Sequence, residues 1–189
     1  MVVGVAGKYC AGKSTVAQML AEAGYRVIDV DRLGHEALAR RGEDVRRVFG
    51  GDYVDEEGSV DRGRLGRLVF RDRTALRRLE SIVHPEMVEM VRERLGTSRQ
   101  PTVINAALLF PMGLDTLCDT VLWVTAPALT RIRRARRRDG LPLGDIVRRF
   151  WAQRSLGPQY SAGDVDIHTV ENRGDLGGLR AQLVRLALL

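Results

Sequence analysis

The sequence has few cysteines and few aromatic residues, and it has no long apolar run. Two cysteines, Cys10 and Cys118, cannot form a disulfide framework and do not have the spacing of metal ligands, which favours a reducing, cytoplasmic setting. No apolar stretch is long enough to span a bilayer, and no basic segment precedes the first predicted strand. We therefore expect neither a membrane anchor nor a signal peptide.

Charge is plentiful and mostly positive. The formal net charge is +6, and almost all of the basic residues are arginines. A basic balance suits a polyanionic ligand, which includes nucleic acid and phosphorylated small molecules. Aromatic residues are only 5% of the chain and seldom alternate with the arginines, which argues against a surface that binds single strands. The 189 residues suffice for one core with appended helical regions.

One glycine-rich stretch near the amino terminus has the spacing of a phosphate-binding P-loop. Gly7 is followed by four residues and then by Gly12, Lys13 and Ser14. The glycines let the backbone approach a polyphosphate, Lys13 can reach the terminal phosphates, and the Ser14 hydroxyl can ligate Mg²⁺. The predicted ATP-binding residues of this loop are Gly7, Lys8, Tyr9, Cys10, Ala11, Gly12, Lys13, Ser14 and Thr15.

The sequence on either side of the loop supports this interpretation over a glycine turn with a chance lysine. Residues 2–5 are typical of a short buried strand, and residues 15–23 of a helix that Gly24 closes. A helix amino terminus beside Cys10 could lower the pKa of its thiol, although a small tolerated residue is the simpler interpretation.

A second strand is predicted at residues 25–29, followed by a polar loop that starts at Asp29-Val30-Asp31. Alternating strands and helices indicate a parallel sheet, whose ligands bind at the carboxyl ends of the strands. Both aspartates would then lie on the same rim as the P-loop. The alternative is that one or both cap a helix that starts near Arg32.

The next sixty residues or so are predicted to be helical, with turns at Gly50-Gly51 and Glu57-Gly58. His84-Pro85 stands at the start of the last of these helices, and a lone histidine is more often structural than catalytic. The predicted helical segments are 33–40, 44–49, 62–70, 74–81 and 85–95.

Strands return at 102–106 and 120–124, and a weaker one is predicted at 165–170. Between them, Pro127 opens an arginine-rich helix, Gly140-Leu141-Pro142 ends it, and a second helix spans 143–155. A basic helical hairpin here is typical of a lid that closes over phosphates, and a solvated basic face is the alternative. Asp175 can cap a terminal helix that reaches Leu188. The arginines of the first lid helix are Arg131, Arg133, Arg134, Arg136, Arg137 and Arg138.

Further motifs follow the P-loop in a fixed order. They are Val27-Ile28-Asp29-Val30-Asp31-Arg32, Phe49-Gly50, Gly58-Ser59-Val60-Asp61-Arg62, Leu65-Gly66, Val69-Phe70, His84-Pro85, Leu108-Leu109-Phe110, Arg138-Asp139, Gln153 and Asn172-Arg173-Gly174. With these motifs the whole chain resembles the dephospho-coenzyme A kinase family. The Ser-Val-Asp-Arg segment with its following Leu-Gly, Val-Phe and His-Pro is far more specific than the P-loop.

The resemblance implies an α/β fold of the P-loop nucleoside-triphosphate-hydrolase type, with a three-layer core around a parallel sheet. It implies a single domain over 1–189, with a core at 1–30, 100–130 and 156–189, a helical substrate-binding insertion at 31–99 and a lid at 131–155. The implied reaction transfers the γ-phosphate of ATP to the 3′-hydroxyl of dephospho-CoA, with Mg²⁺, in the last step of coenzyme A synthesis. We expect no nucleic-acid or membrane partner, and a monomer or small homo-oligomer.

The resemblance also implies roles for single residues. Asp31 would face the acceptor hydroxyl, and Arg138 fits best as the lid arginine that closes over the developing charge. The acceptor side would include Arg62, His84 and Leu108, and Asn172 would lie on the ATP side.

Three positions depart from the family pattern. Asn105 stands where an acidic residue is usual, Ala107 where proline is usual, and Pro111 where glutamate is usual. Loss of two carboxylates could weaken the positioning of Mg²⁺ or substrate. Because Lys13, Ser14 and Asp31 remain, we still expect an active kinase.

Two other functions stay open at this point. A different P-loop kinase would keep the ATP site and change the acceptor, which assays of ADP release over several acceptors would reveal. A basic nucleic-acid-binding or regulatory P-loop protein without turnover would instead show salt-sensitive binding of DNA or RNA.

Overall fold

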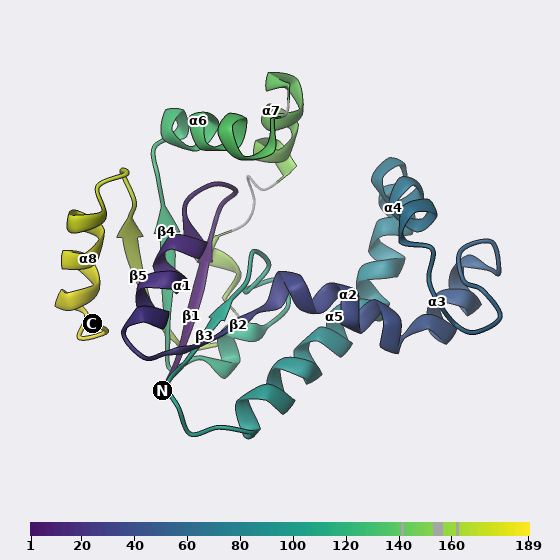
Figure 1. The fold of residues 1–189 in the computed structure, drawn as a ribbon, viewed down its shortest axis with the longest axis horizontal. Helices are drawn as coiled ribbons and strands as arrows, with labels where there is room; N and C mark the ends of the chain where they lie inside the picture. Colours follow the sequence, from purple (N-terminus) through teal and green to yellow (C-terminus); the bar gives the residue numbers. More distant parts are fainter. Residues whose placement is uncertain (141, 153–156, 162) are drawn as a thin grey trace. The chain divides into compact units, whose positions relative to one another are not determined.

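The computed structural model describes residues 1–140, 142–152, 157–161 and 163–189. Contacts divide the chain into two compact units (Figure 1). The sheet unit comprises Met1–Asp29 and Arg99–Leu189, and the helical unit comprises Val30–Ser98. Among the described residues, none of the helices combines the length and apolarity needed to cross a membrane.

Five parallel strands form the centre of the sheet unit, in the order β2-β3-β1-β4-β5. The register sets Val5 opposite Asn105, and Asn105 opposite Asp29, so the carboxyl ends of these strands meet at one edge. The predicted parallel sheet is confirmed, and its central strand leads directly into the P-loop. The strands are β1 (Val2–Gly7), β2 (Arg26–Asp29), β3 (Thr102–Asn105), β4 (Thr120–Thr125) and β5 (Asp166–Glu171).

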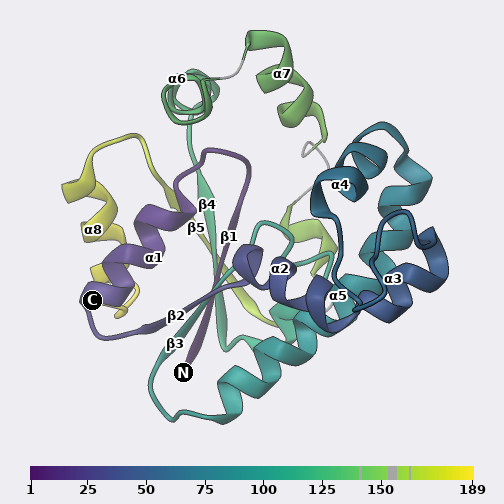
Figure 2. The same ribbon diagram turned by 45° about the vertical axis from the view of Figure 1, so that its right-hand side comes forward.

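Helices α1 (Lys13–Glu22) and α8 (Leu176–Arg185) cover one face of this sheet (Figure 1 and Figure 2). Alternate residues of β1 point to opposite faces, so Val3 and Val5 join the core beneath the two helices. The opposite face packs closely as well. A Cβ added at Gly4 would lie 2.9 Å from Cys118 Sγ, which follows the short helix η1 (Leu114–Leu117).

A buried carboxylate ties two connecting segments of the sheet unit together. Asp115 is fully buried, and its Oδ2 accepts a hydrogen bond of 2.7 Å from Ser161 Oγ. Ser161 directly follows the short helix η2 (Pro158–Tyr160), which leads from the lid back toward β5. Burial raises the pKa of the nearby Cys118 thiol to about 12, so that cysteine is protonated at neutral pH.

The predicted lid corresponds to α6 (Ala128–Asp139) and α7 (Leu143–Ala152), which pack against each other. Gly140 ends α6 with a φ of 61°, a conformation that favours glycine. The predicted end of the second lid helix at Ser155 lies outside the described residues, as do Leu141 and Gln153.

Four helices make up the helical unit, and the longest of them, α5, contacts the other three. Asp61 caps α4 by accepting from the Arg64 amide, and Asp72 caps α5 by accepting from the Thr74 and Ala75 amides. The helices are α2 (Val30–Arg40), α3 (Gly42–Phe49), α4 (Arg62–Arg71) and α5 (Arg73–Gly96). An apolar cluster centred on Val45, Val54 and Leu65 fills the space among them.

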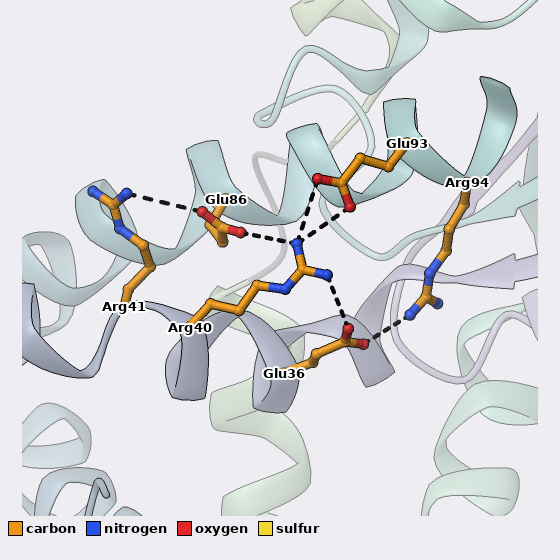
Figure 3. Close-up of polar contacts among 6 residues, drawn as sticks. All are labelled: Glu36, Arg40, Arg41, Glu86, Glu93 and Arg94. Atoms are coloured by element: carbon orange, nitrogen blue, oxygen red, sulfur yellow. Dashed lines mark hydrogen bonds and ion pairs between the residues drawn. The ribbon is translucent and has the colours of Figure 1, made fainter. Parts of the chain in front are cut away.

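An ion-pair network joins α2 to α5 on the surface of the helical unit (Figure 3). Arg40 Nη1 lies 3.3 Å from Glu86 Oε1 and 3.2 Å from Glu93 Oε2. Glu36 accepts from Arg40 on its own helix and from Arg94 Nη2 at 2.7 Å. We call these residues, with Arg41, the α2–α5 network.

Two predicted interruptions between elements are wrong, a loop before the first helix of the helical unit and a break within its longest helix. The chain enters α2 directly at Val30, so no polar loop separates Asp29 from Asp31. Segments 74–81 and 85–95 are one helix that continues through Pro85, although proline removes one backbone hydrogen bond. Buried Val83 and Met87 lie on either side of Pro85 and keep the apolar face continuous.

The terminal helix also ends earlier than predicted. Helix α8 stops at Arg185 rather than Leu188, and Ala187 adopts a positive φ of 53°. Its amino terminus agrees with the sequence, because Asp175 accepts hydrogen bonds from the amides of Gly177 and Gly178.

Candidate active site

The P-loop connects β1 to α1 by a tight turn that only glycine allows at its end. Gly12 has a φ of 102°, and a Cβ there would lie 2.1 Å from Asn172 Nδ2. Gly7 is just as confined, because a Cβ there would lie 2.4 Å from the Val124 carbonyl oxygen. The turn is closed by a hydrogen bond of 3.0 Å from the Ala11 amide to the Lys8 carbonyl. At Gly12 the loop therefore brings backbone, without a side chain, to the amino-terminal end of α1, where a helix attracts anions.

A cavity of about 410 Å³ opens beside the start of α1. Its walls come from the P-loop and from the inward face of α6, and no carboxylate belongs to the lining residues that the structure describes. Lys13 lies in this wall, with its Nζ 3.1 Å from the Gly7 carbonyl oxygen. The lining residues are Cys10, Gly12, Lys13, Ser14, Thr15, Arg134, Arg137 and Arg138. Such a concentration of positive charge around backbone amides suits a polyphosphate.

A larger cavity, of about 630 Å³, lies in the helical unit. Arg64, Arg67 and Arg71 of α4 line it together with two carboxylates, Asp52 and Asp72. It has no glycine loop, and its acidic residues balance much of the basic charge. We therefore place the candidate phosphate site at the smaller cavity, where the chemistry of the walls is more specific.

Arg134 is a site residue that the sequence did not single out. Its Nη1 donates to the Ala11 carbonyl at 3.0 Å, and its Nη2 donates to Asn172 Oδ1 at 2.8 Å. Asn172 is 2% exposed and follows β5, so Arg134 links the P-loop to the end of the edge strand β5. Helical spacing places residues 131, 134 and 138 on one face of a helix, but it does not show that this face meets the P-loop.

A second arginine, Arg131, also supports the loop from the lid. Its Nε donates to the Tyr9 carbonyl at 2.8 Å, and its guanidinium carbon lies 4.1 Å from the centre of the Phe150 ring. Burial lowers the pKa of Arg131 from its usual value, but a guanidinium stays charged at neutral pH. This charge is held against backbone and an aromatic ring.

Arg138 is paired with the neighbouring carboxylate. Its Nε lies 2.7 Å from Asp139 Oδ1, and this hydrogen bond raises the pKa of Arg138. The Tyr9 hydroxyl donates to the same carboxylate. Cys10 lies beside this group, and burial raises the pKa of its thiol. The suggestion that the helix terminus activates Cys10 is therefore not supported, and the small tolerated residue is the better interpretation.

Ser14 lies in the cavity wall next to Lys13. The described residues contain no group of three His, Cys, Asp or Glu side chains that could hold a metal ion. Mg²⁺ is commonly held in phosphoryl-transfer sites by few protein oxygens, phosphate oxygens and water. The hydroxyl of Ser14 fits that mode of binding.

The predicted acceptor-side residues mostly belong to the helical unit. Asp31 is exposed in the first turn of α2, and Arg62 is exposed at the first residue of α4. His84 is half-buried on α5, and burial lowers the pKa of its imidazole. Leu108 lies in the sheet unit, in the turn after β3. Their roles on the acceptor side remain predictions.

The substituted rim position is buried at the end of β3. Asn105 is 6% exposed, and its Oδ1 has no hydrogen-bond partner within the described part of the chain. It neighbours Val5 of β1 and Asp29 of β2 in the sheet register. An amide at this position keeps an oxygen but lacks the negative charge that the family resemblance predicts there.

The parallel sheet, the glycine loop after its central strand and the arginine-bearing lid together define a P-loop kinase fold. A sequence model described as dephospho-CoA kinase matches residues 1–175. A curated dephospho-CoA kinase from Moorella thermoacetica is 35% identical over 96% of this chain and 88% of its own length. The chain belongs to the dephospho-CoA kinase family.

Two solved structures share the fold. A crystal structure from Thermus thermophilus is 34% identical, with a TM-score of 0.79, and the match covers 100% of this chain and 97% of that one. A dephospho-CoA kinase from Campylobacter jejuni shares the fold at 21% identity, with a TM-score of 0.68 over 98% of this chain and 94% of its own.

Proposed function

We propose that this kinase transfers the γ-phosphate of ATP to the ribose 3′-hydroxyl of dephospho-CoA and so forms coenzyme A. The cavity at the start of α1 is the observation that carries the proposal, because Lys13 and three arginines line it and no carboxylate is among its described lining residues. Phosphoryl transfer depends mainly on positioning and on positive charge around the transferring group. Both are available in this cavity.

The roles of the P-loop residues follow from that geometry. The amides of the loop and Lys13 would bind the β- and γ-phosphates, with Gly7 and Gly12 giving the backbone room to approach. The Ser14 hydroxyl would hold Mg²⁺, which neutralises phosphate oxygens when it is bound. Arg138 would turn toward the charge that develops on the transferred group.

Asp31 is the proposed general base. It would orient the acceptor hydroxyl and accept its proton as the oxygen bonds to the γ-phosphorus and the bond to the β-phosphate oxygen breaks. Arg62, His84 and Leu108 would shape the acceptor side, and Asn172 would support the ATP side through its contacts with Gly12 and Arg134. We propose a small-molecule acceptor, a cytoplasmic setting, no nucleic-acid partner, and a monomer or small homo-oligomer.

The proposal is tested by measuring ADP release with ATP, Mg²⁺ and a panel of acceptors, namely dephospho-CoA, a nucleoside monophosphate and a hexose. Mass spectrometry of the product should find one phosphate added to dephospho-CoA and none to the others. Phosphorylation of a different acceptor alone would reassign the substrate. Lys13→Ala should lower transfer about 100-fold or more while the protein stays folded. Undiminished transfer by a folded variant would mean that ATP binds elsewhere.

A further inference from the structure

Tyr9 is an unusual residue for the middle of a phosphate loop, because it is large and only 8% exposed. Its ring is buried together with Ala135 of α6 and Ile146 of α7, and Phe150 packs against the same cluster. The centroids of the Tyr9 and Phe150 rings lie 6.0 Å apart, with the ring planes at 85°. An edge-to-face pair of this kind is attractive. A side chain of the P-loop is therefore part of the core of the lid.

The backbone carbonyl and the side-chain hydroxyl of Tyr9 also bind the lid. Its carbonyl oxygen accepts from Arg131 Nε, whose guanidinium covers Phe150. Its hydroxyl donates to Asp139, the last residue of α6. Tyr9 thus contacts both lid helices by packing and α6 by hydrogen bonds.

Asp139 connects this contact to Arg138. Its Oδ1 accepts from Arg138 Nε at 2.7 Å, and its Oδ2 accepts both from Arg138 Nη2 at 3.2 Å and from the Tyr9 hydroxyl. The guanidinium carbon of Arg138 also lies 5.2 Å from the centre of the Tyr9 ring. The side chain of Arg138 is 60% exposed, so these two neighbours restrict a guanidinium that solvent would otherwise leave free to move.

We propose that Tyr9 is a positioning residue that fixes the lid on the P-loop and, through Asp139, orients Arg138 toward the transferring phosphate. This inference rests on the proposed kinase function. The hydroxyl of Tyr9 shares the carboxylate with Arg138, which lets the guanidinium keep one direction without being fully neutralised. Without that hydroxyl, the carboxylate of Asp139 loses one of its donors and pairs more closely with Arg138, so the arginine is drawn away from the phosphates.

The test is Tyr9→Phe, which keeps the ring and its packing and removes only the hydroxyl. We expect kcat to fall about 10-fold, the scale of one hydrogen bond to a charged group, while the KM for ATP stays within about twofold. Thermal unfolding of the variant and the parent, compared by Tm, should show that the variant is folded. An unchanged kcat would overturn the proposal, as would a fall in ATP affinity that accounts for the whole loss.

A double-mutant cycle separates positioning from a merely structural role. In an Arg138→Ala background, Tyr9→Phe should change kcat by less than about twofold, because the arginine through which it acts is absent. Multiplicative effects of the two substitutions on kcat would show that Tyr9 does not act through Arg138. The parent enzyme is measured beside them, and absence of transfer by the parent would contradict the proposed function rather than the role of Tyr9.

Discussion

Arginines gather at two places in this protein, beside the P-loop in the sheet unit and between α2 and α5 in the helical unit. In the α2–α5 network every guanidinium meets at least one glutamate, and Arg40 meets three (Figure 3). Beside the P-loop, Arg131 and Arg134 instead donate to backbone carbonyls and to the Asn172 amide oxygen. Arg138 is the exception beside the P-loop, because it pairs with Asp139, whereas Arg131 and Arg134 are held there by neutral groups.

The difference shows how the role of an arginine follows from its partners. A guanidinium between carboxylates contributes little beyond local stability, because exposed ion pairs are weak. A guanidinium held by neutral carbonyls keeps its full charge and has a fixed position, and this is what an incoming phosphate requires. The lysines add to the contrast, since Lys8 and Lys13 both lie in the P-loop.

The largest effect is expected when the proposed general base of the helical unit is replaced, rather than a carboxylate that only balances the charge of an arginine. Asp31→Asn keeps the size of the side chain and removes its basicity, so turnover with dephospho-CoA should fall about 10²–10⁴-fold. Calorimetry should find ATP binding unchanged and acceptor binding within a few-fold. Near-normal turnover would remove Asp31 from the mechanism, and lost ATP binding would make it a metal ligand instead.

Glu36→Gln is the matched control for that variant. Glu36 lies on the same helix, and its carboxylate pairs with Arg40 and Arg94. Its loss should leave turnover within about twofold, since the pairs are exposed. If the two variants lost turnover equally, the helix as a whole would matter and the contrast between reacting and structural carboxylates would fail.

The next largest effect is expected from the arginine of α6 that contacts the P-loop. Arg134→Ala removes hydrogen bonds to the P-loop and to Asn172, so the affinity for ATP should fall about 10-fold or more. Arg133→Ala, an exposed neighbour on the same helix, loses the same charge without those contacts and should change ATP affinity by less than about twofold. Calorimetric titration with ATP distinguishes the two. Equal losses would mean that net charge, not the position of Arg134, governs binding.

The sequence predicted these features to different degrees for physical reasons. The P-loop and the buried strands depend on local spacing and composition, so the sequence predicts the loop at residues 7–14 and strands at 102–106 and 120–124, each within one residue of the observed strand ends. The continuity of α5 through Pro85 depends on packing of both halves, which no local signal carries. The importance of Arg134 and Tyr9 depends on which face of α6 meets the loop, and that is settled only by tertiary structure.

A smaller effect is expected from the α2–α5 network itself. Glu86→Gln removes the carboxylate that faces Arg40 and Arg41, so Tm should fall by about 1–4 °C with no change in turnover. The difference from the parent should shrink in 0.5–1 M NaCl, roughly the range in which salt screens exposed pairs. A loss of ATP affinity in this variant would contradict the division between the two arginine groups.

The smallest effect concerns a titrating group of the helical unit that belongs to neither arginine group. Burial lowers the pKa of His84 below its unfolded value near 6.5, while Glu80 opposes the shift. As pH falls through about 6.5, His84 takes up a proton in the unfolded chain but resists protonation in the folded protein. The free energy of unfolding is therefore highest above that pH and declines below it. Glutamine does not titrate, so the Tm of His84→Gln should fall less between pH 7.5 and 5.5 than the Tm of the parent protein. An equal fall in Tm for parent and variant would show that His84 does not carry this dependence.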